Sequence, residues 1–181
     1  MSEKYKFRDK EDIYFVSPTI TGWVDVFTKQ PYFDIIIDSL KYCQKHKGLD
    51  IYAWCIMPSH LHLIIGSEQN SLSDIIRDFK VHTSKKIIQE LKTGTDSRKD
   101  WILNLFQAAA SEIKRSVNYK VWQDGNHPIE LCTNEMMDQR LYYLHNNPVE
   151  SGFVDEEEKY VFSSAITYVD GSGLLEIKII E

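Results

Sequence analysis

Two apolar runs separated by only two residues constrain the fold of this chain more than any other feature. Residues 50–57 and 60–66 are rich in β-branched, aromatic and other apolar side chains, and only Pro58 and Ser59 lie between them. Runs this close pair as antiparallel neighbours, because a parallel arrangement needs a crossover of a dozen or more residues. The sequence therefore predicts an antiparallel hairpin over residues 50–66.

Periodic apolar patterns place further elements on both sides of this hairpin. The predicted elements are a strand over 13–24, a helix over 32–45, the hairpin, a helix over 71–91, a helix over 101–114, an extended segment over 121–131, a helix from 133 to about 146 ended by Pro148, and a short strand over 174–180. This order is typical of an α+β, ferredoxin-like (RRM-like) split βαβ sandwich. We expect an antiparallel sheet with helices on one face, plus a C-terminal tyrosine-bearing helix.

The length and composition predict one domain. The 181 residues, 43% of them hydrophobic, are enough for a single well-buried core. We expect one domain over residues 1–181, with a core at about 11–168 and an acidic C-terminal extension at about 150–181. No apolar run approaches the roughly 18–20 residues of a membrane span, so no membrane partner is expected. Cys43, Cys55 and Cys132 lack the spacing of a zinc or redox motif, which favours a reducing cytoplasm.

The charges are segregated along the chain. The net charge of -6 argues against a nucleic-acid partner, yet residues 77–120 carry ten basic and five acidic side chains, while residues 150–181 carry eight acids and two lysines. A polyanion could therefore bind to the middle of the chain. On charge alone, a lysine-rich helix face that is simply solvated is the stronger alternative.

A histidine pair opens the second strand of the hairpin. Side chains alternate between the two faces of a strand, so His60 and His62 share one face while Leu61 and Leu63 point to the other. Two imidazoles on a rigid strand form a platform for a metal ion. Two ligands make only part of a metal site, and a polar face of a half-exposed strand explains the same pattern.

The late helix carries a second candidate feature. Residues four apart share a helix face, which aligns Tyr143 with Asn147 and places Arg140 one turn before Tyr143. Met137, Leu141 and Leu144 form a separate apolar stripe that can pack against the sheet. The alternative is that Tyr143 is a boundary tyrosine and Asn147 a helix cap before the proline.

Together these features resemble the REP-associated tyrosine transposases, relatives of the single-tyrosine insertion-sequence transposases of the HUH (His-hydrophobic-His) superfamily. The resemblance spans about residues 11–168 and departs from the family at Asn126–Ile129. Its motifs are Trp54–Ile64 around the histidines, the basic helix Phe79–Ile87, Trp122–Gln123, the tyrosine helix and exit Tyr143–Val154, and Phe162–Ala165.

The resemblance implies a function and a set of site residues. It implies that His60 and His62 bind a divalent metal, Mg²⁺ or Mn²⁺, that Asn147 adds an amide oxygen, and that Tyr143 is the nucleophile. It also implies DNA transposition, in which single-stranded DNA near a hairpin is cut and rejoined through a 5′-phosphotyrosine. A tyrosine hydroxyl, with an ordinary pKa of about 10, needs such help to attack a phosphate.

The partner expected from this reading is single-stranded DNA with a hairpin. Trp122 could stack a base, although core packing is its more ordinary role. The chain could act as a homodimer, so Tyr143 could serve its own histidines or those of a partner copy. The candidate phosphate contacts are Arg77, Lys80, Lys85, Lys86, Lys114 and Arg115.

Three other functions remain open. A non-catalytic single-stranded nucleic-acid-binding protein of the same fold would need no metal. A zinc hydrolase would use His60 and His62 for zinc and leave Tyr143 in the core. A domesticated host protein would retain DNA nicking without mobility.

Overall fold

The sheet has four antiparallel strands in the order β2-β3-β1-β4. The computed structural model describes residues 12–112 and 118–180. Its strands are β1 (Tyr14–Val16), β2 (Asp50–Met57), β3 (His60–Gly66) and β4 (Ile129–Glu130). In the hairpin, Met57 pairs with His60 and Cys55 with His62. The hairpin has the predicted bounds, and the strand order is that of the predicted split βαβ fold.

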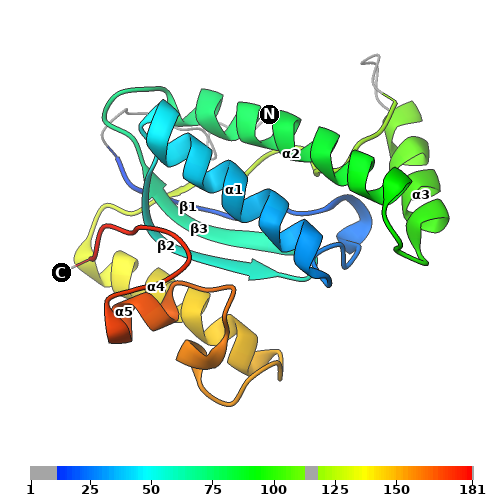
Figure 1. Cartoon of the computed structure of the whole chain (residues 1–181). Helices are drawn as coiled ribbons and strands as arrows, with labels where there is room; N and C mark the ends of the chain where they lie inside the picture. Colours follow the sequence, from blue (N-terminus) through cyan, green and yellow to red (C-terminus); the bar gives the residue numbers. More distant parts are fainter. Residues whose placement is uncertain (1–11, 113–117, 181) are drawn as a thin grey trace.

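Two long helices cover one face of the sheet, as Figure 1 shows. They are α1 (Gln30–Lys47) and α2 (Leu72–Thr93), with α3 (Lys99–Ser111) at one end of the layer. Leu61 and Leu63 point into this layer and belong to the larger apolar core. Gly48 ends α1 with a left-handed φ of 66°, a conformation that suits glycine. None of the described helices is long and apolar enough to cross a membrane.

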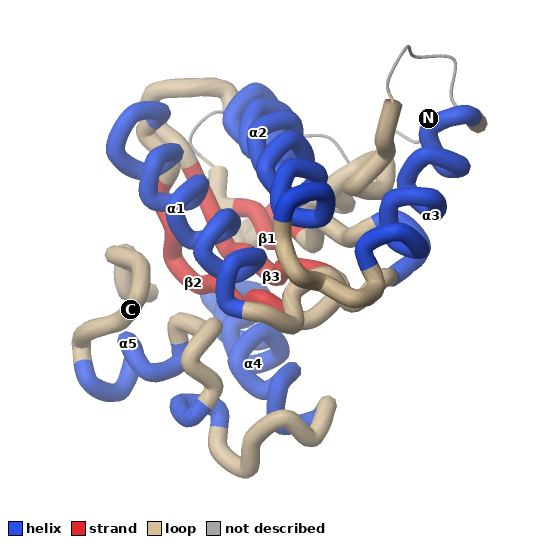
Figure 2. Tube along the Cα trace, turned by 45° about the vertical axis from the view of Figure 1, so that its right-hand side comes forward, coloured by secondary structure: helices blue, strands red, loops and turns tan. Residues whose placement is uncertain are grey.

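The helix that carries Tyr143 covers the opposite face of the sheet (Figure 2). This helix, α4 (Asn134–Glu150), packs on β2 and β3, and α5 (Ala165–Asp170) follows it beyond a short 3-10 turn at Glu157–Lys159. A second apolar cluster joins Leu144 of α4 to Phe15 and Ile64 of the sheet. The α1–α2 layer and the α4–α5 layer therefore enclose the sheet between them.

Helix α4 is longer than the sequence predicts. We expected Pro148 to end it near Asn146, but it continues to Glu150 with Pro148 inside. Proline removes one backbone donor, and in the last turn only a single helical hydrogen bond is lost. Backbone donors of Ser151 and Phe153 bond to the carbonyl groups of Asn147 and Pro148 and hold the end of the turn.

Three extended predictions correspond to shorter elements or to none. The strand predicted over 13–24 is regular only at Tyr14–Val16, because Pro18 has no N–H for a ladder. The segment predicted over 121–131 contributes the two residues of β4. Residues 174–180 form no strand, although the backbone N–H of Lys178 donates to the Ile51 carbonyl at 2.9 Å.

The helix predicted to residue 114 ends at Ser111, and residues 113–117 are not described.

The C-terminal extension covers the exposed edge of β2. The Ile56 N–H donates to the Phe162 carbonyl, and the Ser164 N–H donates to the Trp54 carbonyl, at 2.9 and 2.8 Å. An open edge strand can pair with other chains, and this segment occupies part of that edge.

The prediction that residues 1–181 form a single domain stays a prediction.

Candidate active site

The two histidines of β3 face α4 and point toward each other. Their Nε2 atoms lie 3.1 Å apart, and their ring centroids are 4.6 Å apart. The alternation of β3 explains this arrangement, since residues 60 and 62 face one side of the sheet and leucines 61 and 63 the other. His62 also stacks on Phe15 of β1, with centroids 5.5 Å apart. The predicted common face is confirmed.

Serine hydroxyl groups hold the other nitrogen of each histidine. Ser17 Oγ lies 2.9 Å from His62 Nδ1, and Ser59 Oγ lies 3.1 Å from His60 Nδ1. When Nδ1–H of an imidazole donates to such an oxygen, the Nε2 lone pair is left free for a ligand. Both rings are therefore oriented with their ligand-binding nitrogens toward the same point.

Burial keeps both histidines neutral. Burial, the nearby His60 ring and the Arg140 charge together lower the pKa of His62 to about 3. Burial also lowers the pKa of His60, while Asp25 raises it to a smaller extent. A metal-binding imidazole must be unprotonated, so the rings are in the form that binds metals at neutral pH.

Helix α4 brings Tyr143 to this pair. The helix begins after Thr133, whose side-chain oxygen caps it by accepting a hydrogen bond from the Met136 N–H at 3.2 Å. Leu144 is fully buried in the second apolar cluster and fixes the helix on the sheet. Tyr143 then lies edge-on to His62, with ring centroids 5.2 Å apart, and is 40% exposed. The candidate nucleophile is thus accessible and adjacent to the histidines of its own chain.

Arg140 and Asn147 lie one turn before and one turn after Tyr143 on α4. The Arg140 guanidinium carbon is 5.1 Å from the centre of the Phe15 ring, which brings a positive charge next to the histidine pair. Asn147 is half-buried, and among the described residues its side-chain amide has no hydrogen-bond partner. Its oxygen is therefore available to a ligand.

The donor set, two imidazoles with an amide oxygen one turn along α4 from Tyr143, could hold a divalent metal that keeps several open positions. Adjacent ligands of an octahedral ion, each at about 2.1 Å, are about 3.0 Å apart, close to the measured Nε2 separation. Residues 12–112 and 118–180 contain no group of three or more His, Cys, Asp or Glu side chains that could hold a metal. A metal here would take two imidazoles from the protein and complete its coordination with an amide oxygen, substrate or water.

The predicted phosphate contacts on α2 lie over the other face of the sheet. Lys85 and Lys86 are exposed there, while Arg77 forms ion pairs with Asp74 and Asp78. Two further candidates, Lys114 and Arg115, lie outside the described residues. Arg77, Lys85 and Lys86 are therefore not part of the histidine and tyrosine cluster.

Lys80 is bonded within the protein. Its Nζ donates to the Gln123 and Gly125 carbonyl groups and to Asn126 Oδ1, at 2.8, 3.0 and 3.0 Å. Burial lowers its pKa to about 8. Lys80 thus fastens α2 to the loop over residues 123–126, whose Asn126 carbonyl accepts a hydrogen bond from the Ser17 N–H.

Trp122 is a core residue. It is 5% exposed, and its indole N–H donates to Thr83 Oγ1 at 3.0 Å. Its more ordinary role is confirmed. The exposed tryptophan near the histidines is instead Trp23, whose ring centroid lies 5.6 Å from the ring centroid of His60.

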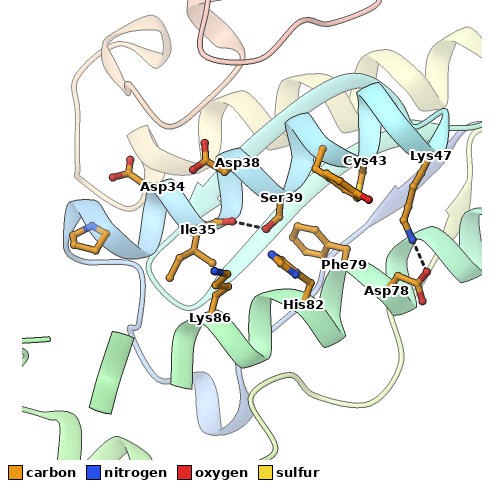
Figure 3. A pocket seen from close by; sticks show the side chains of 12 residues that line it. Asp34, Ile35, Asp38, Ser39, Cys43, Lys47, Asp78, Phe79, His82 and Lys86 are labelled. Carbon is orange, nitrogen blue, oxygen red and sulfur yellow. Dashed lines mark hydrogen bonds and ion pairs between the residues drawn. The ribbon is translucent and has the colours of Figure 1, made fainter. Parts of the chain in front are cut away.

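A groove of about 760 Å³ between α1 and α2 is separate from this cluster. Figure 3 shows Asp34, Asp38 and Lys86 around it, with Phe79 and Cys43 from the facing helices. No residue of the histidine and tyrosine cluster lines the groove. It is a surface feature of the α1–α2 layer.

Sequence reasoning missed Ser17, Phe15 and Trp23. Ser17 lies 45 residues before His62, and helix α1 lies between each of the three residues and the histidine that it contacts. Pairing of β1 with β3 brings Phe15 beside Ile64 and sets Ser17 against His62. A local pattern carries no signal of such pairing.

Comparisons with known proteins bear on the family and on the fold. The family model for IS200-like transposases matches residues 24–108. No curated protein matches the chain. Among solved structures, the chain is similar to a REP-associated tyrosine transposase bound to a REP hairpin, at 16% identity and a TM-score of 0.64, covering 100% of this chain and 94% of that one. At this identity the likeness bears on the fold.

A second solved structure, a candidate transposase from Deinococcus radiodurans R1, is 16% identical with a TM-score of 0.45, covering 81% of this chain and 97% of that one. This second likeness is too low to support an inference.

Proposed function

We propose that this chain, whose residues 24–108 match the family model for IS200-like transposases, cuts and rejoins single-stranded DNA through a covalent bond to Tyr143. The observation that carries this proposal is the contact between Tyr143 and His62, whose ring centroids are 5.2 Å apart within one chain. A tyrosine kept partly exposed beside two neutral imidazoles is arranged for chemistry rather than for packing. The contact of Tyr143 with His62 of its own chain supports attack in cis.

His60, His62 and Asn147 would hold a divalent metal, Mg²⁺ or Mn²⁺. When bound, the metal offsets negative charge on the scissile phosphate and makes its phosphorus more electrophilic. Ser17 and Ser59 orient the imidazole rings for this role. Arg140 supplies a further positive charge near His62, where it would attract and position a phosphate.

Tyr143 would form the covalent intermediate. Its Oη attacks phosphorus, the Oη–P bond forms, and the P–O3′ bond on the opposite side breaks. The phenolic proton is released and the departing 3′ oxygen takes up a proton, so the step neither consumes nor produces protons overall. Reversal by a 3′-hydroxyl group restores a phosphodiester, and no external energy source is needed because the phosphotyrosine retains the bond energy.

The substrate proposed is single-stranded DNA next to a hairpin. The structurally similar protein is bound to a REP hairpin, which motivates the same class of ligand for this chain. Lys85 and Lys86 are free to contact phosphates on the α2 side, away from the cut. The three cysteines are all free thiols, consistent with a proposed cytoplasmic location.

A covalent-adduct assay tests the proposal. The full chain is incubated with Mn²⁺ and labelled oligonucleotides in which a randomised single strand adjoins a hairpin, and products are resolved on denaturing gels. We expect a protein–DNA adduct that Tyr143→Phe abolishes and that the control Tyr142→Phe, altered at the exposed neighbouring tyrosine, retains. An adduct that persists in Tyr143→Phe refutes the assignment of the nucleophile.

Metal titration separates the remaining functions. Loss of Mn²⁺ affinity in His60→Ala with His62→Ala, but not in His82→Ala on the exposed face of α2, supports the ligand assignment. Stoichiometric zinc without a DNA adduct would favour a hydrolase. DNA binding with neither metal nor adduct would favour a non-catalytic binding protein.

A further inference from the structure

Trp23 is a large aromatic side chain exposed beside the histidine pair, and the proposed chemistry leaves it unused. It is 62% exposed, yet its ring meets that of His60 at 70° with centroids 5.6 Å apart. Burial does not explain it, because most of the side chain remains in water. An aromatic surface presented next to a site for single-stranded DNA is the usual form of a base-stacking platform.

The backbone around Trp23 is held in an uncommon conformation. Gly22 and Trp23 both have left-handed φ values, 69° and 56°, and a bulky aromatic residue rarely adopts one. The surrounding structure enforces it, since the Trp23 N–H donates to the Ile20 carbonyl at 3.0 Å and the Thr21 N–H donates to the Val121 carbonyl at 2.8 Å. Unfavourable backbone conformations that are held in this way cluster at functional sites.

The position of Trp23 indicates which side of the cut it serves. Trp23 contacts His60, His60 contacts His62, and His62 contacts Tyr143, so the four rings form a continuous series of contacts with Trp23 and Tyr143 at its ends. In an in-line displacement, the departing oxygen lies across phosphorus from the attacking oxygen. With the phosphate bound at the two histidines and Tyr143 attacking from one side, the departing 3′ oxygen therefore lies on the opposite side of phosphorus, where Trp23 is found.

We infer that Trp23 stacks the nucleobase on the 3′-hydroxyl side of the cleaved phosphate. The inference rests on the proposed function and adds a binding role that the chemistry requires. After cleavage the 5′-phosphate strand is covalently attached to Tyr143, but the 3′-hydroxyl strand is free to diffuse away. Stacking on Trp23 keeps that strand in place for rejoining, and it accepts any base because every base has an aromatic face.

The experiment uses the oligonucleotide sequence recovered from the covalent adduct of the wild-type chain. Binding of the intact oligonucleotide is measured by fluorescence anisotropy in a Tyr143→Phe background, which prevents cleavage. We compare Trp23, Trp23→Ala, Trp23→Phe and the control Trp101→Ala, which alters a tryptophan that is 56% exposed on α3. Each protein is also measured with an abasic nucleotide on either side of the cut, and circular dichroism compares the folding of all variants.

We expect Trp23→Ala to weaken binding about 5- to 150-fold, the equivalent of roughly 1–3 kcal/mol for one stacked base. Trp23→Phe retains most of the affinity, and Trp101→Ala binds like the parent protein. The abasic nucleotide on the 3′-hydroxyl side weakens the parent protein by a similar factor but has little further effect in Trp23→Ala, as expected for two partners in one contact.

Equal binding by the parent and Trp23→Ala overturns the inference while leaving the proposed function intact. If the abasic nucleotide on the 5′-phosphate side is instead the one whose effect disappears in Trp23→Ala, Trp23 stacks a base of the other strand segment. That result overturns the assignment of Trp23 to the 3′-hydroxyl side. Failure of the wild-type chain to form any adduct removes the proposed function, and this inference with it.

Discussion

Replacing Ser17 by alanine tests how strongly the metal site depends on a residue that binds no metal itself. Ser17 Oγ lies 2.9 Å from His62 Nδ1, and His62 is only 4% exposed, so water cannot easily replace the lost partner. Residues that orient a metal ligand in this way typically contribute 10- to 100-fold in affinity, about 1.4–2.8 kcal/mol. The cost of leaving a buried N–H unpaired, about 1–3 kcal/mol, agrees with that range.

Isothermal titration with Mn²⁺ measures the effect, and nitrogen NMR of the metal-free protein reports which nitrogen of His62 carries the proton. We expect Ser17→Ala to bind Mn²⁺ 10- to 100-fold more weakly and to shift the proton distribution of His62. Ser39→Ala is the matched control, since it also removes a hydroxyl, one bonded to the Ile35 carbonyl within α1. Equal Mn²⁺ affinity in wild type and Ser17→Ala would refute the reasoning.

Four further predictions concern stability and DNA contacts. Leu144→Ala should lower the unfolding free energy, measured by urea titration, by about 2–5 kcal/mol, because the side chain is fully buried between α4 and the sheet. A change below about 1 kcal/mol would contradict that anchoring role. Burial lowers the pKa of His145 from 6.5 to about 4, so its contribution to stability, about 3 kcal/mol, is present above pH 6.5 and is lost as the pH falls toward 4. Urea titrations across this range should show that the unfolding free energy depends less on pH in His145→Gln than in the wild type. An equal pH dependence in the two proteins would count against this prediction. Lys80→Met should cost about 1–3 kcal/mol of stability without changing the salt dependence of DNA binding, because its ammonium bonds to the protein. Lys86→Ala should instead lower the slope of log affinity against log salt by about 0.7 if it contacts one phosphate of a single strand.

Local patterns predicted much of the fold. The hairpin, the long helices and their order follow from periods of two and about 3.6 residues, which act within a few neighbours along the chain. The errors occurred at the ends of elements. Pro148 remains inside α4, and residues 174–180 follow the edge of β2 without forming a strand. Whether a marginal segment becomes regular depends on the partners that packing brings to it.

The candidate site was predicted in two halves. Strand alternation placed His60 and His62 on one face, and helical spacing aligned Tyr143 with Asn147. Family resemblance joined the halves, since neither local pattern relates residues some eighty positions apart. The contact between His62 and Tyr143 arises because α4 packs on the sheet face opposite to α1 and α2, with Leu144 as its buried anchor.

The sequence by itself determined which side chains share a strand face or a helix face, because that relation is set by backbone geometry over a few residues. Only the tertiary structure decided which face meets which. It placed Ser17 behind His62 and Trp23 beside His60, and it bonded Lys80 to the loop over residues 123–126. These contacts depend on strand pairing and on packing across both faces of the sheet, where residues distant along the chain become neighbours.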